Sequence, residues 1–278
     1  MPATRIEPEV LSDRDLRAIV RLVHERAGIA LHDGKRALVT SRLQRRVRAC
    51  GFRSLREYVA HVVADPDGEE VVALLDAIAT NHTAFFREPQ HFRFLADVVL
   101  PAFAHRVPDI WSAACATGEE PYSIAMTLAD ALPAERLGQV RVLASDLSTR
   151  ALRTAAAGVY PIRRLSALDH DLRRRHFERG LGAHEGLARV NRRARSLVRF
   201  ERVNLATLGE TGRQFDVIFC RNVMIYFDRA VQQRVVTALE RHLRPGGWLF
   251  ISHAESLNGL RHGLRWVAPA IYQRNGVS

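Results

Sequence analysis

The segment Trp111–Leu128 reads WSAACATGEEPYSIAMTL, and its pattern decides the fold of the chain. An apolar run gives way to a loop of small residues, and two carboxylates precede a proline. The pattern predicts a strand that ends near Ala114 and a helix that begins near Pro121, because proline suits a first helical position. Glu119 and Glu120 then fall in the loop, where their charges would repel a pyrophosphate. We therefore expect a neutral or positively charged ligand.

A second carboxylate follows the next predicted strand. The stretch VRVLASDLS indicates a short buried strand over 140–144 with Asp146 beyond its end, where ribose-binding acids occur. A nucleoside at Asp146 and a cationic group near Glu119 fit S-adenosylmethionine (SAM) better than NAD, because the phosphates of NAD need backbone N–H groups free of acidic neighbours. Alternatively, Asp146 only caps the helix that begins at Ser148.

The rest of this region alternates predicted strands and helices. FDVIFCRNVMIYF contains another apolar run, a helical pattern follows over 230–243, and Pro245 and Gly246 end that helix before the strand in WLFIS. This alternation is typical of an α/β fold, with a parallel sheet covered by helices on both faces and ligands beyond the carboxyl ends of the strands. The residues expected at such ends are Gly118, Asp146, Asn204 and Asn222.

The composition favours two domains with a substantial core, since the chain has 278 residues, of which 47% are hydrophobic and 26% charged. The N-terminus shows no targeting segment, and no apolar run is long enough to span a bilayer, so we expect a cytoplasmic protein without membrane insertion. Cys50, Cys115 and Cys220 are isolated, as expected of reduced thiols. The histidines lack ligand spacing, so no metal is expected.

The net charge of +11 is unevenly distributed. Every charged side chain between Lys35 and Arg56 is basic, and Val39, Leu43 and Val47 recur every four residues as an apolar stripe on the opposite side of a predicted helix. Such a basic face is typical of a solvated surface, but it also suits an acidic partner, whose encounter rate it would raise. The arginines considered for docking are Arg42, Arg45, Arg46 and Arg48.

The domain organisation follows from these patterns. Residues 11–79 show helical periodicity, with glycines between the segments. A basic stretch beginning near residue 158 leads through RGLGAHEG to the strand-like LARV and SLVRF; RGLGAHEG follows no buried strand and precedes no helix, which favours a loop or hairpin over a dinucleotide turn. We predict a helical domain over 1–80, a linker and the start of the ligand pocket over 81–108, and an α/β domain over 109–278 with an insertion at about 158–200.

Four separated motifs follow one another along the chain: TNHTAFFRE (80–88), SAACATGEEPYSIAMTLAD (112–130), ASDLS (144–148) and FCRNVMIYF (219–227). In this order they resemble the CheR family of chemotaxis receptor methyltransferases, and the similarity runs from Leu11 to Arg274. The resemblance implies a Rossmann-like class I SAM-dependent methyltransferase sheet, an N-terminal all-helical domain and a small antiparallel β insertion. It also implies methyl transfer from SAM to glutamate side chains of chemoreceptor cytoplasmic helices, giving glutamate 5-O-methyl esters and S-adenosylhomocysteine (SAH).

The resemblance implies roles for individual residues of the cofactor pocket. Glu119 and Asp146 are expected to bind the amino-acid and ribose portions of SAM. The other residues expected in the pocket are Asn81, Thr83, Arg87, Asn204, Leu205, Arg221 and Asn222. Without the resemblance, the polar turn TNHT is better explained as a helix cap.

Two residues are expected to act in catalysis. A glutamate with a pKa of about 4.3 is already ionised at neutral pH, so no general base is needed and alignment becomes the main contribution of the protein. Arg87 is the expected orienting residue, because a guanidinium holds a carboxylate in two-point contact. Tyr226 is expected to donate a second hydrogen bond, although an aromatic ring packed beside Phe227 explains it equally well.

The expected partners are methyl-accepting chemotaxis receptors, through their acidic methylation helices. In some family members the β insertion also captures a C-terminal receptor peptide by strand addition. We expect a monomer that binds no nucleic acid. Two other functions would use the same cofactor fold: a basic nucleic-acid methyltransferase, although CRNVMIY lacks the Asp/Asn-Pro-Pro-aromatic motif typical of amine methylases, and a noncatalytic SAM-sensing module that binds receptors.

Overall fold

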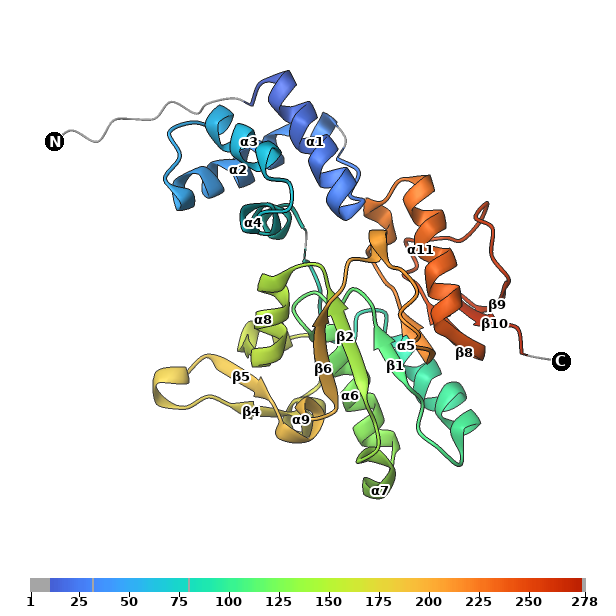
Figure 1. The fold of residues 1–278 in the computed structure, drawn as a ribbon. Helices are drawn as coiled ribbons and strands as arrows, with labels where there is room; N and C mark the ends of the chain where they lie inside the picture. Colours follow the sequence, from blue (N-terminus) through green and yellow to red (C-terminus); the bar gives the residue numbers. More distant parts are fainter. Residues whose placement is uncertain (1–10, 32, 80, 277–278) are drawn as a thin grey trace. The chain divides into compact units, whose positions relative to one another are not determined.

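The computed structural model describes residues 11–31, 33–79 and 81–276. The chain forms two compact units, which can be followed in Figure 1. Unit 1 comprises Met1–Thr80 together with Tyr226–Val231, and unit 2 comprises Asn81–Ile225 and Gln232–Ser278. Thr80, the first residue of the TNHT turn, lies outside the described residues. No helix within the described ranges is both long and apolar enough to cross a membrane.

Unit 1 is helical, as predicted. Its described helical elements are α1 (Asp13–Ala27), the 3₁₀ turn η1 (Asp33–Lys35), α2 (Arg36–Cys50), α3 (Leu55–Ala64) and α4 (Glu69–Ile78). Ser12 caps α1 by accepting a hydrogen bond from Asp15 N, and Gly28 ends this helix in the left-handed conformation, at φ 69°. Leu16, Ile19 and Val23 are buried on one face of α1.

A segment from far along the chain belongs to unit 1. Ala30 N donates a hydrogen bond to the Tyr226 carbonyl at 2.7 Å, and Ile29 forms an isolated antiparallel bridge with Phe227. The predicted division near residue 80 does not include the segment Tyr226–Val231. The segment contacts the end of α1 and the following turn only in the folded chain, so the sequence composition could not predict that it belongs to unit 1.

Unit 2 is built on a mixed sheet. Seven strands of the described chain lie in the order β6-β2-β1-β7-β8-β10-β9. Their bounds are β1 (Ile110–Ser112), β2 (Val142–Asp146), β6 (Val198–Arg202), β7 (Phe215–Phe219), β8 (Leu243–Phe250), β9 (Leu264–Ala268) and β10 (Ile271–Arg274). Neighbours from β6 to β8 are parallel, whereas β10 pairs antiparallel with β8 and β9. The parallel part confirms the predicted α/β architecture.

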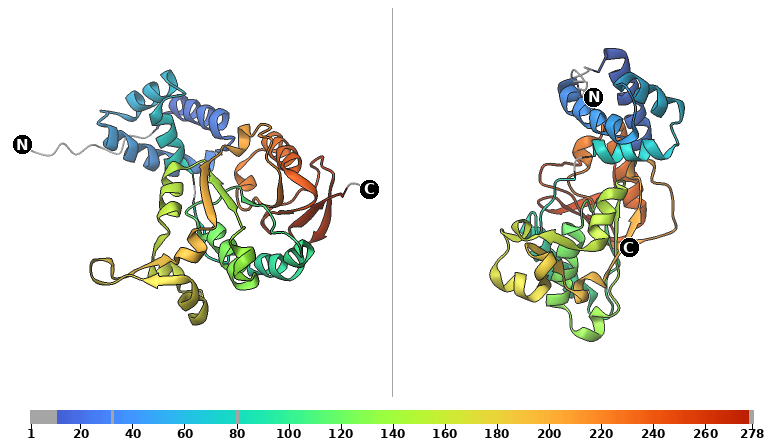
Figure 2. Two further views of the ribbon diagram at one scale, coloured as in Figure 1. Left: turned by 60° about the horizontal axis from the view of Figure 1, so that its bottom comes forward. Right: turned by 90° about the vertical axis from the view of Figure 1, so that its left-hand side faces the viewer.

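Both faces of this sheet are covered. Neighbouring side chains of a strand point to opposite faces, yet all of β7, FDVIF, is buried. Val217 and Phe219 join Met126 and Leu128 in the main apolar core. The helices of unit 2 away from the insertion, which Figure 2 shows from two further sides, are α5 (Pro89–Phe94), α6 (Glu119–Ala131), α7 (Ala134–Leu137), α8 (Thr149–Ala157) and α11 (Arg229–His242), whose first residues belong to unit 1.

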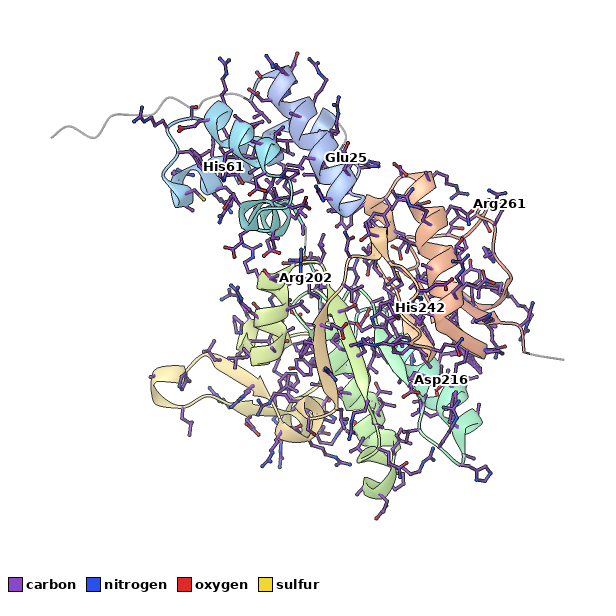
Figure 3. All side chains as sticks on the ribbon, viewed as in Figure 1. Glu25, His61, Arg202, Asp216, His242 and Arg261 are labelled. Carbon is purple, nitrogen blue, oxygen red and sulfur yellow. The ribbon has the colours of Figure 1, made fainter. Side chains whose placement is uncertain are left out.

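A buried carboxylate secures the amino end of β7. Asp216, labelled in Figure 3, accepts hydrogen bonds from Arg106 at 2.6 and 2.7 Å, from Asp109 N at 2.8 Å and from Arg244 at 2.8 Å. Burial alone would raise the pKa of Asp216, but these partners lower it below its ordinary value. The charged group therefore fixes the sheet at the edge opposite to the predicted ligand residues.

The stretch 81–108, expected as a linker and the start of the ligand pocket, carries helical structure. Besides α5 it contains the π-helix η2 (Leu95–Val99) and the 3₁₀ helix η3 (Leu100–Phe103). Phe92, Leu95 and Val99 are buried and belong to the main core of unit 2. These apolar residues recur at helical spacing, so the stretch is a packed part of the α/β unit.

The predicted insertion forms a small antiparallel sheet in the order β3-β5-β4. Its elements are β3 (Val159–Pro161), η4 (Ile162–Leu165), α9 (His170–His176), β4 (Phe177–Arg179), η5 (Gly182–His184), β5 (Leu187–Val190) and α10 (Arg192–Arg195). RGLGAHEG leads from β4 through η5 to β5, which confirms a hairpin connection. The strand predicted in SLVRF instead joins the main sheet as β6, parallel to β2.

The loop after β1 corrects one prediction. Helix α6 begins at Glu119, so Glu119 and Glu120 lie in its first turn and not in the loop. Carboxylates in a first turn are stabilised by the partial positive charge of the helix N-terminus, which here outweighs the preference of Pro121 for the first position. Strand β2 also begins and ends later than predicted, with Asp146 as its last residue.

We expect Gly118→Ala to destabilise unit 2. Gly118 has φ 99°, and a Cβ atom there would lie 2.8 Å from both Ala155 Cβ and Tyr160 Oη. Backbone strain and overpacking together should lower the free energy of unfolding by about 2–4 kcal/mol. Urea unfolding measures this, with Gly209→Ala as the control, because a Cβ atom at Gly209 meets nothing within 4 Å. Equal stability of the two variants would contradict the role of this turn.

Candidate functional site

The residues expected at strand ends follow neighbouring parallel strands at the carboxyl edge of the sheet in unit 2, as predicted. They are Gly118 after β1, Asp146 at the end of β2, Asn204 after β6 and Asn222 after β7. Val203 N donates to the Asp146 carbonyl at 3.2 Å, which joins the ends of β6 and β2. Because these strands are adjacent in the sheet, their ends form one continuous edge.

Asp146 connects two loops of this edge. Its Oδ2 accepts a hydrogen bond from Ala116 N at 2.9 Å, and its Oδ1 accepts one from Ser148 N at 2.8 Å. The N-cap of α8 is Ser148 itself, whose hydroxyl accepts from Ala151 N. The Asp146 carboxylate thus links the loop after β1 to the residue that caps α8.

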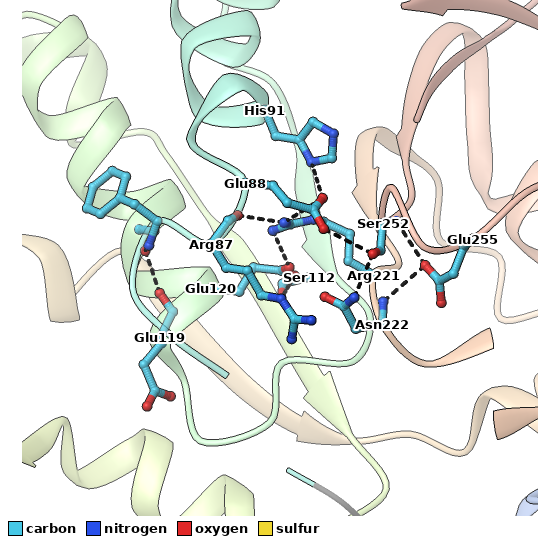
Figure 4. A network of polar contacts seen from close by, with 12 residues as sticks. Arg87, Glu88, His91, Ser112, Glu119, Glu120, Arg221, Asn222, Ser252 and Glu255 are labelled. Atoms are coloured by element: carbon cyan, nitrogen blue, oxygen red, sulfur yellow. Dashed lines mark hydrogen bonds and ion pairs between the residues drawn. The ribbon is translucent and has the colours of Figure 1, made fainter. Parts of the chain in front are cut away.

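Glu119 places a second carboxylate at this edge. Its side chain is 0% exposed, its Oε2 accepts a hydrogen bond from Thr117 Oγ1 at 2.6 Å, and its Oε1 lies 2.5 Å from Arg164 Nη1. Figure 4 shows the Glu119 carboxylate pointing away from the ion pairs around Arg221. A buried carboxylate needs charged or polar partners, so this position suits a cationic ligand group.

Arg221 is the centre of a buried ion-pair network (Figure 4). Its side chain is 1% exposed and lies 3.0 Å from both Glu88 Oε2 and Glu120 Oε2. Ser112 Oγ donates to Glu120 Oε1 at 2.8 Å. Burial raises the pKa of Glu120 despite these partners, whereas the pKa of Glu88 is lowered because Arg221 outweighs the effect of its burial. Arg221 thus holds together the ends of β1 and β7 and the start of α5.

The backbone of Arg87 is held by a hydrogen bond, whereas its side chain has N–H donors without a partner among the described residues. Its carbonyl accepts a hydrogen bond from Arg221 Nη2 at 2.5 Å, and its own Nη1 donates to the His82 carbonyl at 3.2 Å. The side chain is half-buried. A guanidinium carries five donors, so most of them remain available to a ligand.

Glu255 holds the loop after β7 in place. Its carboxylate accepts hydrogen bonds from Asn222 N, Val223 N, Met224 N and Ser252 N at 2.8–3.0 Å. These contacts support the backbone of Asn222 at φ 59°, in the left-handed region, which is uncommon for residues other than glycine. The Asn222 amide also donates to Ser252 Oγ at 2.6 Å, so both the backbone and the side chain of Asn222 are positioned.

The remaining predicted pocket residues lie along the same unit. Asn81 Nδ2 donates to Ser148 Oγ at 3.4 Å, which brings Asn81 beside Asp146. Asn204 caps η6 (Leu205–Thr207) by accepting from Ala206 N at 3.1 Å, and Leu205 is buried. Thr83 is half-buried.

Tyr226 belongs to the other unit. It is half-buried, its carbonyl accepts a hydrogen bond from Ala30, and Lys35 Nζ lies 5.5 Å from the centre of its ring. The predicted role of Tyr226 beside Arg87 therefore stays a prediction.

The four arginines of α2 that were predicted to dock a partner differ in their surroundings. Arg45 and Arg48 are exposed. Arg42 donates to the Ile78 carbonyl, and Arg46 forms a two-point ion pair with Glu70, at 2.9 and 2.6 Å. Burial alone would raise the pKa of Glu70, but Arg46 and the hydroxyl of Tyr58 lower it, so this pair is charged at neutral pH. Arg45 and Arg48 are thus better placed than Arg42 and Arg46 to meet a partner.

No metal is expected, and one cluster of the described residues bears on this prediction. Glu88, His91 and His253 offer ligand atoms within 4.8 Å of one another. Arg221 already pairs with Glu88 Oε2, the oxygen that faces His91 Nδ1 at 3.5 Å. A metal ion here would be repelled by the buried guanidinium, so we expect elemental analysis of the purified protein to find less than stoichiometric metal. Stoichiometric zinc that His91→Ala removes would contradict this expectation.

Several residues of this network were not predicted from the sequence as part of the site. Glu88, Glu120, Ser252 and Glu255 complete the network around Arg221 and Asn222. A signal for two of them was present, because SHAES directly follows the apolar run of β8 and so marks another strand end. Arg164 lies in η4, next to the inserted sheet, and no motif marks it.

Comparison with known proteins agrees with this arrangement. A family profile described as "CheR methyltransferase, SAM binding domain" matches residues 81–271, and one described as "CheR methyltransferase, all-alpha domain" matches residues 14–79. The chain is 44% identical over 252 residues to a chemotaxis protein methyltransferase of Klebsiella aerogenes (89% of this chain, 85% of that protein) and 43% identical over 251 residues to that of Salmonella typhimurium (90% and 86%). It is 41% identical over 266 residues to the Escherichia coli protein (94% and 91%). The chain therefore belongs to the CheR methyltransferase family.

Proposed function

We propose that this chain transfers the methyl group of SAM to glutamate carboxylates of chemoreceptor cytoplasmic helices, as in chemotactic adaptation. The observation that supports it most is a pair of acids beyond neighbouring strands, Glu119 at the start of α6 and Asp146 at the end of β2, in a chain whose relatives are named chemotaxis protein methyltransferases. The buried Glu119 carboxylate fits the cationic amino-acid part of SAM, and Asp146 fits its ribose. Asn81, Asn204 and Asn222 would complete the pocket.

The reaction requires the protein mainly to align the reacting groups. When bound, SAM would supply a methyl group on a positively charged sulfur. An ionised glutamate oxygen can bond to that methyl carbon as the carbon–sulfur bond breaks and SAH leaves, so no general base is needed. Arg87 would orient the acceptor carboxylate with its spare donors, while Arg221 holds the Arg87 backbone. Tyr226 would donate a further hydrogen bond through its hydroxyl.

Transfer of a labelled methyl group tests this function. Purified chain and labelled SAM are incubated separately with receptor cytoplasmic fragment, RNA and DNA. We expect label on the receptor alone, released as methanol by mild base, because glutamate methyl esters are base-labile. Base-stable label on nucleic acid would favour a nucleic-acid methyltransferase, and SAM binding without transfer would favour a noncatalytic sensor.

The exposed arginines of α2 are proposed to dock the acidic receptor helix. We expect Arg45→Glu combined with Arg48→Glu to lower receptor methylation about tenfold at low salt and low receptor concentration, because charge complementarity governs encounter rates. The difference should shrink as salt rises. Initial rates over a range of receptor and salt concentrations measure it.

The matched control reverses two exposed arginines of α11, Arg234 and Arg241, with the same change in net charge. This control should methylate receptor at nearly the wild-type rate. Equal losses in both double variants would show an effect of net charge and not of docking on α2.

The remaining parts of the proposal concern partners and location. We infer that the chain acts as a monomer in the cytoplasm, where the methylated receptor helices lie. A C-terminal receptor peptide is a second proposed partner, since β3 and β4 are the edge strands of the inserted sheet and could be extended by one strand.

A further inference from the structure

Arg164 of η4 meets Glu119 at the carboxyl edge of the main sheet. Its Nη1 lies 2.5 Å from Glu119 Oε1, and the Glu119 side chain is 0% exposed. Thr117 Oγ1 bonds the other carboxylate oxygen at 2.6 Å. A side chain of the inserted sheet region therefore reaches the acid expected to bind the cationic part of SAM.

The approach of Arg164 is fixed by its neighbours. Tyr160 Oη, on β3, donates to the Thr117 carbonyl at 2.7 Å, and the Tyr160 side chain is buried. Leu165, next to Arg164, is also buried in the main core. The segment from β3 through η4 is thus anchored on both sides of Arg164 against the loop after β1.

Arg164 retains the capacity to bind a ligand. A guanidinium has five N–H donors. Among the described residues, Glu119 is the one hydrogen-bond partner of the Arg164 side chain. The Arg164 side chain is 43% exposed, in contrast to buried Glu119. The rest of its guanidinium is therefore partly exposed to solvent.

We propose that Arg164 binds the α-carboxylate of the amino-acid part of SAM, beside the α-ammonium group bound by Glu119. The inference rests on the proposed function, because it presupposes SAM at this edge. The ammonium and carboxylate of an amino acid share one carbon atom, so their protein partners must be adjacent and opposite in charge. Glu119 and Arg164 meet this requirement, and a guanidinium matches a carboxylate in two-point geometry.

Calorimetry with two ligands tests the inference. SAM carries the α-carboxylate, whereas decarboxylated SAM keeps the ammonium group and lacks only the carboxylate. We expect Arg164→Gln to weaken SAM binding about 10- to 100-fold, as for loss of a charge-assisted hydrogen bond, and to change the affinity for decarboxylated SAM by less than about threefold. The control is Arg163→Gln, an exposed neighbour on η4 that should bind both ligands as the wild type does.

The other outcomes separate the possible failures. Equal weakening of both ligands by Arg164→Gln would mean that Arg164 acts on the fold of the pocket, and tighter binding of SAM would mean that it competes with SAM for Glu119. Either result overturns the inference. If the wild type bound neither ligand, the proposed function itself would be wrong.

Discussion

Arg87→Ala is expected to lower kcat for receptor methylation by about 100-fold or more, because misalignment of reacting groups by about 1 Å has effects of this size. The buried Arg221 holds the Arg87 backbone, and the Arg87 side chain is half-buried with donors to spare. Loss of the guanidinium should therefore remove carboxylate orientation without unfolding unit 2. Steady-state rates at saturating SAM and receptor measure the effect.

Two variants make this prediction specific. Arg87→Lys keeps the charge but not the two-point geometry, so its kcat should lie between those of wild type and Arg87→Ala. Arg93→Ala removes an exposed arginine of α5 and should leave kcat unchanged. Wild-type turnover by Arg87→Ala would exclude Arg87 from the mechanism. The kcat of Tyr226→Phe measures in the same way what the tyrosine hydroxyl contributes to the reaction.

Arg221→Ala is expected to cause the largest loss of stability. The substitution would leave Glu88 and Glu120 without their buried cationic partner, and breaking a buried ion pair in this way costs about 3–5 kcal/mol. It would also release the Arg87 carbonyl, so SAM binding should weaken as well. Urea unfolding at neutral pH measures the change in the free energy of unfolding.

An exposed ion pair serves as the control for Arg221. Arg213 lies 2.8 Å from Glu201, and both side chains are at least 36% exposed. Removal of such a pair changes the free energy of unfolding by about 0–1 kcal/mol. If Arg221→Ala lowered the free energy of unfolding no more than Arg213→Ala does, the buried network would not stabilise the site.

The strand ends could be predicted because they depend on local pattern. Apolar runs in the sequence mark β1, β2 and β7, and parallel strands bring their carboxyl ends to one edge. Asp146 and Asn222 were therefore placed correctly at this edge. The start of α6 was misjudged by two residues, because Pro121 was weighed more heavily than the carboxylates that begin the helix.

The contacts behind the edge could not be predicted. Arg221 pairs with Glu120, 101 residues away in the sequence, and Glu255 reaches Asn222 across 33 residues. Such pairs follow from the order of strands in the sheet, which sequence periodicity does not encode. On α2 the helical spacing identified the basic face, but the pairing of Arg46 with Glu70 required the packing of α2 with α4.

Calorimetric titration of SAH tests the central claim, that Glu119 at the start of α6 and Asp146 at the end of β2 hold the methyl donor. The wild type should bind SAH at one site per chain. Glu119→Gln and Asp146→Asn should each weaken binding at least about tenfold, as expected for loss of a hydrogen bond to a charged group, while Glu135→Gln, an exposed change on α7, should bind normally. Absence of SAH binding by the wild type, or wild-type affinity in both acid variants, would contradict the claim.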